Sequence, residues 1–580
     1  MSSPSLPRFA DEALDLSAFF DSPDLSNWEQ AARDALRGDA LEQLSTQSLD
    51  EVCYQPLYSA ADLPAQLTQI PENADFRRGL AQPGWRIVQA YSKTDTMLQD
   101  AEEGLLEGVD GLQYEGLFDQ LPDLADKPGL PSLQCLSDIV QLPAAPDAHT
   151  RFSWLWDGWS AYLQATAPDA QAFKAHHRQL RERLQAQPSD RLFISSRPWH
   201  EAGSTASLEL ASLAASLVDS LQTLTSESLT PEHIFRQTTL ELSIGPELFL
   251  ELAKCRATRI IIQRVAEAYG SDARGIQWQA RTSRRFLSQL DRYNNLLRQT
   301  LSALAAVMGG VQTLITEPLD ILSPAQSQTS MARRLARNLQ LILRHEVHLD
   351  QWVDPAGGSY LIERLTQTLA ESAWKQFQQI EAEGGLLQAW PAGHLQKQVA
   401  TTAAARQQQA ATRQQTLIGV NLYAAAEDGM TSPPKNLQPL QPLRLAEPFE
   451  ALRQAQAADP VSVTLLPLSN TKQSQARLAF ASAFFAVAGC ETAIASPVAN
   501  VAELAQQLAA SATDILVLCG ADSDYEQLLS DAQLNPPPHG QLVLAGKPGD
   551  VYRQAGVQHF IFAGCDLLAS FKALKPSWLV

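Results

Sequence analysis

Short strand-like runs alternate with longer helical runs over about 250 residues, and this alternation restricts the fold more than any other feature of the chain. The strand candidates are 86–91, 112–115, 133–136, 152–155, 192–195, 238–244, 276–281 and 311–316. The clearest helical runs are 207–225, 246–269, 293–307 and 329–348. Such alternation is typical of a parallel α/β fold, and eight strands favour a (β/α)8 TIM-type barrel over an open sheet.

Two regions flank the predicted barrel. Residues 1–80 are predicted to form an N-terminal arm, with helical spacing after Trp28 and an extended segment over 52–58. The barrel and its following helices, including 361–384 and the Gln/Ala-rich 396–415, are expected to occupy 81–425.

A separate domain is predicted at the C-terminus. Five prolines between Pro433 and Pro448 mark 426–460 as a linker that forms neither helix nor central strand. Strand-like and helical runs then alternate again over 461–580, with strand candidates at 463–466, 515–519, 542–545 and 559–563 and a helix at 476–488. This pattern predicts a small doubly wound, flavodoxin-like domain.

Composition excludes several classes of function. The chain has 580 residues and a formal net charge of -20, which disfavours binding to nucleic acid or to an anionic membrane. Its six cysteines have no metal-knuckle or redox spacing, so we expect reduced, mostly buried thiols. The N-terminus lacks a signal- or transit-peptide pattern, and the most apolar run, 479–490, is far shorter than the roughly 20 residues that span a bilayer. We therefore expect a cytoplasmic protein.

Four strings carry a resemblance to a known family. They are Asp354-Pro355-Ala356-Gly357-Gly358-Ser359-Tyr360; Arg281-Thr282-Ser283 with Tyr293-Asn294-Asn295 and Gly309-Gly310; Ala332-Arg333-Arg334-Leu335-Ala336-Arg337-Asn338; and Leu417-Ile418-Gly419-Val420-Asn421. In order and spacing they resemble the cobalamin-dependent methylmalonyl-CoA mutase family. The resemblance implies a TIM-type barrel followed by a cobalamin-binding domain.

The strings do not by themselves indicate catalysis. The Asp-Pro-Ala-Gly-Gly-Ser run has the composition of a tight turn. A basic row, Arg333, Arg334 and Arg337, is typical of a solvated or ion-paired helix face. Arg281 and Ser283 end a barrel strand, where side chains usually face a ligand, so vestigial ligand contact and a structural role are both open for this pair.

The resemblance also implies a cofactor site that this chain lacks. Active family members hold adenosylcobalamin through an Asp-x-His-x-x-Gly motif at the start of the C-terminal domain. The positions aligned with Asp, His and Gly are Lys472, Ser474 and Arg477, and no histidine lies between 395 and 538. A lysine cannot orient a cobalt-ligating histidine, and a serine is a poor cobalt ligand. No bound cofactor and no metal site are therefore expected in this chain.

The family's catalytic positions in the barrel are changed as well. Aligned on Glu-Ala-Gly, the catalytic histidine is Pro198 and the neighbouring tyrosine is Arg197. An arginine and a tyrosine that face the substrate in active members are Val88 and Ala90. His200 lies two positions beyond the catalytic place, and a structural or capping role is the favoured interpretation. No catalytic residue is therefore expected.

The chain keeps the family's fold-forming strings, whereas its cofactor and catalytic strings are altered. In this combination it resembles the non-catalytic small subunits of heterodimeric methylmalonyl-CoA mutases. The resemblance implies a catalytic large subunit as partner, which would carry adenosylcobalamin and isomerise (R)-methylmalonyl-CoA to succinyl-CoA. Two alternatives stay open: a regulatory or chaperone-like binder of a mutase or of its associated GTPase, and an active acyl-CoA mutase with an unusual cofactor mode. The chain is not itself that GTPase, since Gly546-Lys547 is followed by Pro548 instead of Ser or Thr.

Overall fold

The computed structural model describes residues 25–37, 40–63, 84–91, 103–104, 106–115, 133–137, 152–323, 329–425, 440–498, 500–530 and 532–578. The chain divides into two compact units, Met1–Asp62 and Leu63–Val580. The predicted arm boundary at residue 80 and the linker segment 426–439 fall outside the described residues.

The first unit is small and has little core. It contains α1 (Leu25–Ala35), the 3-10 turns η2 (Leu41–Leu44) and η3 (Ala60–Asp62), and an antiparallel pair of two-residue strands, β1 (Thr46–Gln47) and β2 (Cys53–Tyr54). No residue of α1 is buried. The predicted helical spacing, which runs from Trp28 to Leu44, and the extended segment after residue 52 are thus present, but helix α1 already ends at Ala35.

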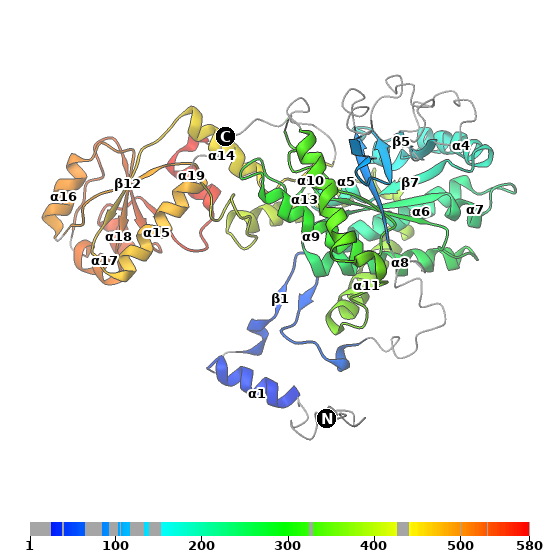
Figure 1. Cartoon of the computed structure of the whole chain (residues 1–580). Coiled ribbons are helices and arrows are strands. Elements are labelled where there is room, and N and C mark those ends of the chain that lie inside the picture. The colour runs from blue at the N-terminus through cyan, green and yellow to red at the C-terminus, as the bar shows by residue number, and fades with distance from the viewer. Residues whose placement is uncertain are drawn as a thin grey trace, which may run out of the picture. The chain divides into compact units, whose positions relative to one another are not determined.

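Eight parallel strands form the barrel sheet of the second unit (Figure 1). They are β3 (Arg86–Tyr91), β4 (Gly111–Tyr114), β5 (Leu133–Ser137), β6 (Phe152–Trp156), β7 (Arg191–Ser195), β8 (Thr238–Ile244), β9 (Gln277–Thr282) and β10 (Thr313–Ile315). Strands follow one another in chain order, and β10 pairs with both β9 and β3. This confirms the predicted α/β class with a curled parallel sheet of the TIM type.

Helices surround this sheet. They are α3 (Gly158–Gln164), α4 (Ala170–Ala186), α5 (Arg197–Glu201), α6 (Ala206–Leu224), α7 (Pro231–Arg236), α8 (Leu248–Ala268), α9 (Asn294–Met308), α10 (Ser330–His345), η8 (Leu349–Gln351), α11 (Tyr360–Ala382), α12 (Leu386–Ala389) and α13 (His394–Ala411). Thr205 and Thr329 start α6 and α10 by accepting a hydrogen bond from a first-turn amide, as N-caps do. Because α11 packs over both α6 and α8, these two helices are buried nearly all round.

The C-terminal region contains a second parallel sheet. Its strands are β11 (Val463–Pro467), β12 (Thr492–Ile494), β13 (Ile515–Cys519), β14 (Gln541–Ala545) and β15 (His559–Ile561). Their order is β12-β11-β13-β14-β15, a common doubly wound arrangement. The helices of this region are α14 (Glu447–Ala458), α15 (Lys472–Val487), α16 (Val501–Ala510), α17 (Asp522–Leu529), α18 (Asp550–Gln554), α19 (Leu567–Leu574) and the 3-10 turn η9 (Pro576–Trp578).

The predicted linker is wrong in its second half. Helix α14 lies inside 426–460, with Pro448 in its first turn. A proline there lacks an N–H that would have no intrahelical partner anyway, so it starts a helix instead of preventing one. Of the five cysteines whose side chains the structure describes, four are buried and Cys53 is exposed; all five are free thiols. In the described part of the chain, no helix is long and apolar enough to cross a bilayer.

Candidate functional site

Arg281, on β9, points into the barrel and is held there by three carboxylates. Its Nε lies 3.4 Å from Glu241 Oε2 on β8, and its Nη1 lies 3.4 Å from Glu317 Oε1 after β10; Nη2 pairs with Glu115 after β4. Arg281 is buried, and burial alone would lower its pKa, but the three carboxylates outweigh burial and raise it. The side chain is thus fully occupied by partners from this chain.

Further polar side chains complete the filling of the barrel. Glu241 accepts hydrogen bonds from Ser195 Oγ (2.8 Å) and from Gln279 Nε2 (2.7 Å). Gln279 also donates to Gln113 Oε1 at 3.0 Å. All these residues are buried, and their mutual bonds satisfy most of their polar groups; the Gln279 Oε1 is buried without a hydrogen-bond partner among the described residues.

Glu317 is the central anion at the carboxyl end of the strands. Arg284 Nη2 lies 2.8 Å from its Oε1, and Arg197 Nη2 lies 3.8 Å away. Burial would raise the pKa of Glu317, but Arg284, Arg281 and Arg197 together lower it to about 2. The rim where TIM-type barrels bind their ligands therefore holds an ion cluster built from the chain's own residues.

The altered catalytic positions border this cluster. Val88 and Ala90 share one face of β3, because side chains alternate along a strand. Gln89, on the opposite face, donates to the Arg333 carbonyl on α10, so Val88 and Ala90 face the barrel interior. Pro198 is buried in the first turn of α5, next to Arg197. These four positions supply no acid, base or nucleophile.

Ser283 has a structural partner. Its Oγ accepts a hydrogen bond from the Arg285 amide at 3.0 Å, and it is buried. The sequence left the role of Arg281 and Ser283 open. In the structure, both side chains are bonded to other residues of this chain.

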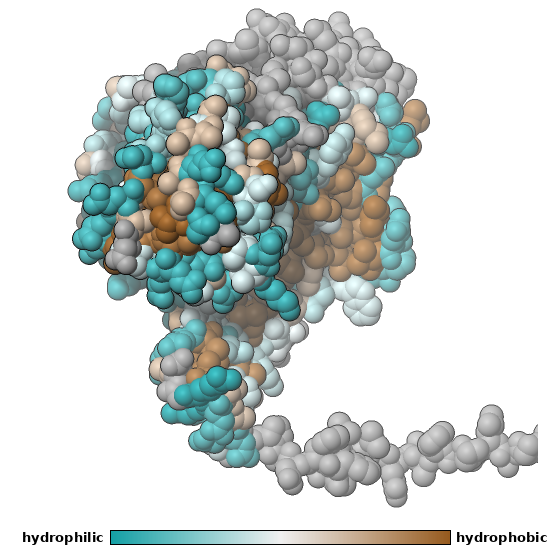
Figure 2. All heavy atoms as spheres, turned by 90° about the vertical axis from the view of Figure 1, so that its left-hand side faces the viewer, coloured by the Kyte–Doolittle hydropathy of each residue, from teal (hydrophilic) through white to brown (hydrophobic). Residues whose placement is uncertain are grey.

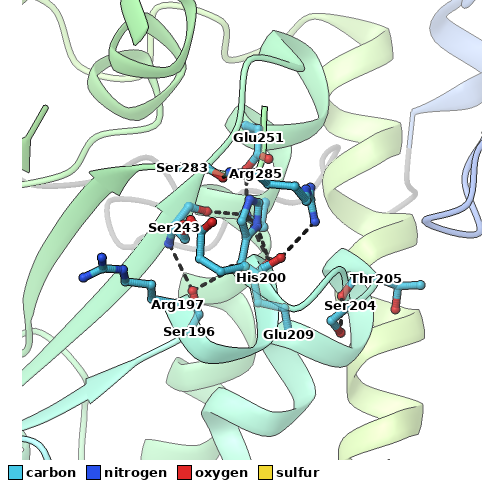
Figure 3. A network of polar contacts seen from close by, with 12 residues as sticks. Ser196, Arg197, His200, Ser204, Thr205, Glu209, Ser243, Glu251, Ser283 and Arg285 are labelled. Atoms are coloured by element: carbon cyan, nitrogen blue, oxygen red, sulfur yellow. Dashed lines mark hydrogen bonds and ion pairs between the residues drawn. The ribbon is translucent and has the colours of Figure 1, made fainter. Parts of the chain in front are cut away.

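His200 belongs to a buried network beside the same rim, joined to Arg284 through Ser243 and Glu201 (Figure 3). Its Nδ1 lies 3.1 Å from Glu209 Oε2, and Lys254 Nζ lies 3.1 Å from the same oxygen. Lys254 also pairs with Glu251 (2.6 Å), and Ser196 Oγ donates to Glu209 Oε1 (2.6 Å). Burial, followed by nearby cations, lowers the pKa of His200 well below its usual value, so the imidazole is neutral. These contacts engage Nδ1 of His200, whereas its buried Nε2 has no hydrogen-bond partner among the described residues.

The carboxyl edge of the C-terminal sheet is also filled. Ser474 is fully buried and its Oγ donates to the Cys519 carbonyl at 2.8 Å. Arg477 donates from Nη1 to the Ala545 carbonyl (2.5 Å) and pairs through Nη2 with Asp522 (2.9 Å). Tyr525 Oη accepts from the Gly520 amide at 2.9 Å and lies 3.0 Å from the Ala545 carbonyl oxygen. Doubly wound sheets bind their ligands at this edge.

The residues at this edge do not fit a cobalamin. The His position is Ser474, whose hydroxyl is used by a strand carbonyl, and the Asp position, Lys472, is exposed at the start of α15. Arg477 lies over Gly546, where an added Cβ would be 2.9 Å from its Nη1. Among the described residues, no group of three or more His, Cys, Asp or Glu side chains is arranged to hold a metal ion.

The Asp-Pro-Ala-Gly-Gly-Ser turn is fastened to the barrel helices. Arg256 on α8 pairs through Nη1 with Asp354 and through Nη2 with Glu363 Oε1 at 2.6 Å. Glu363 also accepts from the Gly358 amide at 3.0 Å. The turn thus ties α11 to α8, which confirms a structural use of this string. In the basic row, Arg337 is buried and paired with Glu107, whereas Arg334 is exposed.

Two asparagines of the remaining strings also serve the fold. Asn295 donates to the carbonyls of Ser288 (2.8 Å) and Leu319 (3.0 Å). Asn421 donates to Ala410 and Gln415 carbonyls and accepts from the Leu417 amide at 2.7 Å. Both are buried, so the retained strings act as internal hydrogen-bonded braces.

Sequence reasoning missed the residues that fill the two edges, including Glu317, Glu241, Glu209, Lys254 and Tyr525. A signal existed for one of them: Glu241 interrupts the otherwise uncharged, buried strand β8. A buried charge requires a partner, so Glu241 and Arg281 on successive strands could have been paired.

Comparison with known proteins identifies the family. The methylmalonyl-CoA mutase family model matches residues 181–508. A methylmalonyl-CoA mutase small subunit of Streptomyces virginiae is 30% identical over 612 residues, covering 96% of this chain and 97% of that one. Small subunits of Porphyromonas gingivalis and Propionibacterium freudenreichii subsp. shermanii are 31% and 26% identical, covering 65% and 84% of this chain and 64% and 82% of their own length. A family model that matches over half of the chain, and a relative that matches nearly all of it, show that this chain belongs to the methylmalonyl-CoA mutase family.

Proposed function

We propose that this chain is the non-catalytic small subunit of a heterodimeric methylmalonyl-CoA mutase. In this proposal a large subunit binds adenosylcobalamin and isomerises (R)-methylmalonyl-CoA to succinyl-CoA, and the present chain supports it structurally. The names of the small-subunit relatives, which imply a larger companion, are consistent with this role.

The observation that carries the proposal is that the chain's own side chains occupy both ligand-binding edges. Arg281, Arg284 and Glu317 fill the barrel rim, and Ser474, Arg477 and Tyr525 fill the edge of the C-terminal sheet. The buried braces of the fold, by contrast, are intact. A chain that keeps its fold but fills its sites is suited to holding a partner.

The N-terminal unit gives further support. Leu25, Leu44 and Leu57 are exposed on it, and Trp28 and Tyr54 are only half-buried. Apolar side chains exposed on a small unit, whose described residues form little core, are suited to contact with a second protein.

Co-purification with the large subunit, followed by an activity assay, tests the proposal. We expect the large subunit alone to be unstable or poorly active and to gain isomerase activity when this chain is co-expressed. A Lys472→Ala variant should support the same activity, because Lys472 holds no cofactor in this proposal. A large subunit that is monodisperse and fully active alone would refute a structural role and favour a regulatory or chaperone-like one.

A spectroscopic titration tests the cofactor part separately. Hydroxocobalamin added to the isolated chain should keep the spectrum of free cobalamin. A base-off, histidine-ligated spectrum would overturn the proposal. The triple variant Lys472→Asp, Ser474→His, Arg477→Gly should still lack mutase turnover, since Pro198 and Ala90 are unchanged.

A further inference from the structure

Three guanidinium groups meet a single carboxylate oxygen at the barrel rim. Glu317 Oε1 lies 2.8 Å from Arg284 Nη2 and 3.4 Å from Arg281 Nη1. Arg284 Nε also donates to this oxygen at 3.0 Å, and Arg197 Nη2 lies 3.8 Å from it. One cation is enough to neutralise a carboxylate, so the convergence of three on one oxygen is the arrangement of an anion-binding site.

The three arginines come from two separate segments at the carboxyl ends of the strands. Arg197 opens α5 after β7, and its side chain points away from His200 (Figure 3). Arg281 lies near the end of β9, and Arg284 follows just after that strand. Loops at this end of a TIM-type barrel are where its ligands bind. The arginines thus have the placement of residues that hold a ligand.

Glu317 is the counter-charge on which two of these arginines depend. Among the described residues, Arg197 and Arg284 form no ion pair except the one with Glu317. Arg281 differs, because it has two further carboxylate partners. The three arginines and the three carboxylates balance one another, so removal of the Glu317 carboxylate alone leaves the group with an excess positive charge.

Glu317 enters this group from a third segment of the chain. It follows β10, and its amide donates to Thr282 Oγ1 at 2.9 Å, which holds its main chain beside the end of β9. The Glu317 side chain is 3% exposed, whereas the side chains of Arg197 and Arg284 are 27% and 32% exposed. The carboxylate is therefore the buried member of the group, and two of the arginines connect it with solvent.

We infer that Arg197, Arg281 and Arg284 form a carboxylate-binding site, which Glu317 occupies as an internal ligand. In the unaltered chain this occupation excludes free carboxylates from the barrel rim. When the Glu317 carboxylate is removed, the site takes a small monocarboxylate in its place. The inference deepens the proposed function and rests on it in one respect, since it takes the rim to be filled by the chain's own residues.

Chemical rescue of Glu317→Ala in the isolated chain tests the inference. The substitution deletes Cγ and the carboxyl group, a fragment of the size of acetate. Thermal unfolding is therefore measured at neutral pH in sodium acetate and in sodium chloride of equal ionic strength. Acetate should raise the melting temperature of the variant progressively with its concentration, as a ligand of the folded state does. In an NMR titration with isotope-labelled acetate, the variant should bind at least about tenfold more tightly than the unaltered chain.

Acetamide is the matched probe, because it has the size of acetate but no charge. It should not stabilise Glu317→Ala; stabilisation equal to that by acetate would overturn the inference, since a cavity would then be filled without recognition of an anion. The double variant Glu317→Ala, Arg284→Gln should lose most of the acetate effect. Figure 2 shows hydrophilic residues over much of the face that it draws, so salts also act on many exposed groups. Glu232→Ala breaks the exposed pair with Arg236 and is the control variant, for which acetate and chloride should have equal effects.

Glu317→Gln decides the question if Glu317→Ala folds in neither salt. The amide keeps most of the side-chain contacts but not the charge, so acetate should stabilise this variant more than chloride does. If acetate stabilises neither Glu317 variant beyond its effect on Glu232→Ala, the inference is overturned. That result would leave the proposed function standing, because binding of the large subunit by the unaltered chain is measured separately. Conversely, a chain that binds no large subunit would refute the proposed function without changing the acetate result.

Discussion

The barrel rim and the edge of the C-terminal sheet each contain an arginine at the carboxyl ends of parallel strands, but the two are held differently. Arg281 is buried among three carboxylates, two of them also buried. Arg477 is about a third exposed and is held by a main-chain carbonyl and by Asp522, which is largely exposed. The first arrangement is a coupled charge cluster, and the second is a single side chain resting over a strand end.

This difference determines how much stability is lost when one side chain is removed from each edge. Removing one member of a buried ion cluster leaves its partners charged and unsolvated, which is costly. When an exposed arginine is removed, water can hydrate the groups to which it was bonded, so the loss in stability is small. The barrel rim should therefore tolerate single changes poorly, whereas the C-terminal edge should tolerate them well.

The largest effect is expected for Glu317→Ala. Three arginines would lose their shared counter-charge, and we expect a loss of about 3–5 kcal/mol in the free energy of unfolding. Thermal and denaturant unfolding measure it. The control is Glu232→Ala, whose exposed pair with Arg236 should contribute less than about 1 kcal/mol. Equal losses of unfolding free energy for Glu317→Ala and Glu232→Ala would contradict a coupled charge cluster at the barrel rim.

Acid titration should expose the same residue without removing it. The pKa of Glu317 is about 2 in the folded chain against 4.5 ordinarily, so its ion pairs stabilise the fold above pH 4.5 and are lost as the pH falls toward 2. The shift corresponds to a loss on the order of 3 kcal/mol. Stability measured between these pH values should fall more steeply for the unaltered chain than for Glu317→Gln. Parallel slopes would rule this contribution out.

An intermediate effect is expected for Tyr525→Phe. Its buried hydroxyl bonds the Gly520 amide and approaches the carbonyls of Leu518 and Ala545. We expect a loss of about 1–2 kcal/mol, since main-chain groups at the strand ends lose a partner. Tyr552→Phe, on the more exposed ring that packs edge-on against Tyr525, is the comparison variant and should lose less.

The smallest effect is expected for Arg477→Ala. Because its side chain and that of Asp522 reach solvent, we expect a change of about 1 kcal/mol or less in unfolding free energy. The comparison with Glu317→Ala on the same denaturant curves is the test. A loss as large as that of Glu317→Ala would mean that the C-terminal edge is as tightly coupled as the barrel rim.

Local sequence patterns predicted much of the fold and less of the site. The bounds of β3, β8 and β13 agree with the predicted runs, since β-branched, aromatic or large aliphatic residues dominate each of them. The edge strand β12 was missed because it is only three residues long and partly exposed, so it shows no apolar pattern. Pro448 misled the linker prediction, since a proline in the first helical turn has the opposite effect to one inside a helix.

The filling of the edges was harder to predict for a physical reason. The residue types at 472, 474 and 477 indicate that the family's cofactor motif is absent. They do not indicate which contacts Lys472, Ser474 and Arg477 make instead. The partners of Arg281 come from β8 and from the segments after β4 and β10, which lie far apart in sequence and meet only when the sheet curls. Pairings of that kind depend on the closed order of the strands and not on any local spacing.

The counter-charges of Arg281 have a consequence for biosynthesis. A protein whose binding pocket is completed by its ligand gains stability in proportion to the logarithm of ligand concentration, so its abundance follows the supply of that ligand. Here Glu115, Glu241 and Glu317 are encoded in the same chain as the arginine that they neutralise. The neutralisation of Arg281 therefore needs no bound ligand, and the charge balance of this part of the barrel should be complete as soon as the chain has folded.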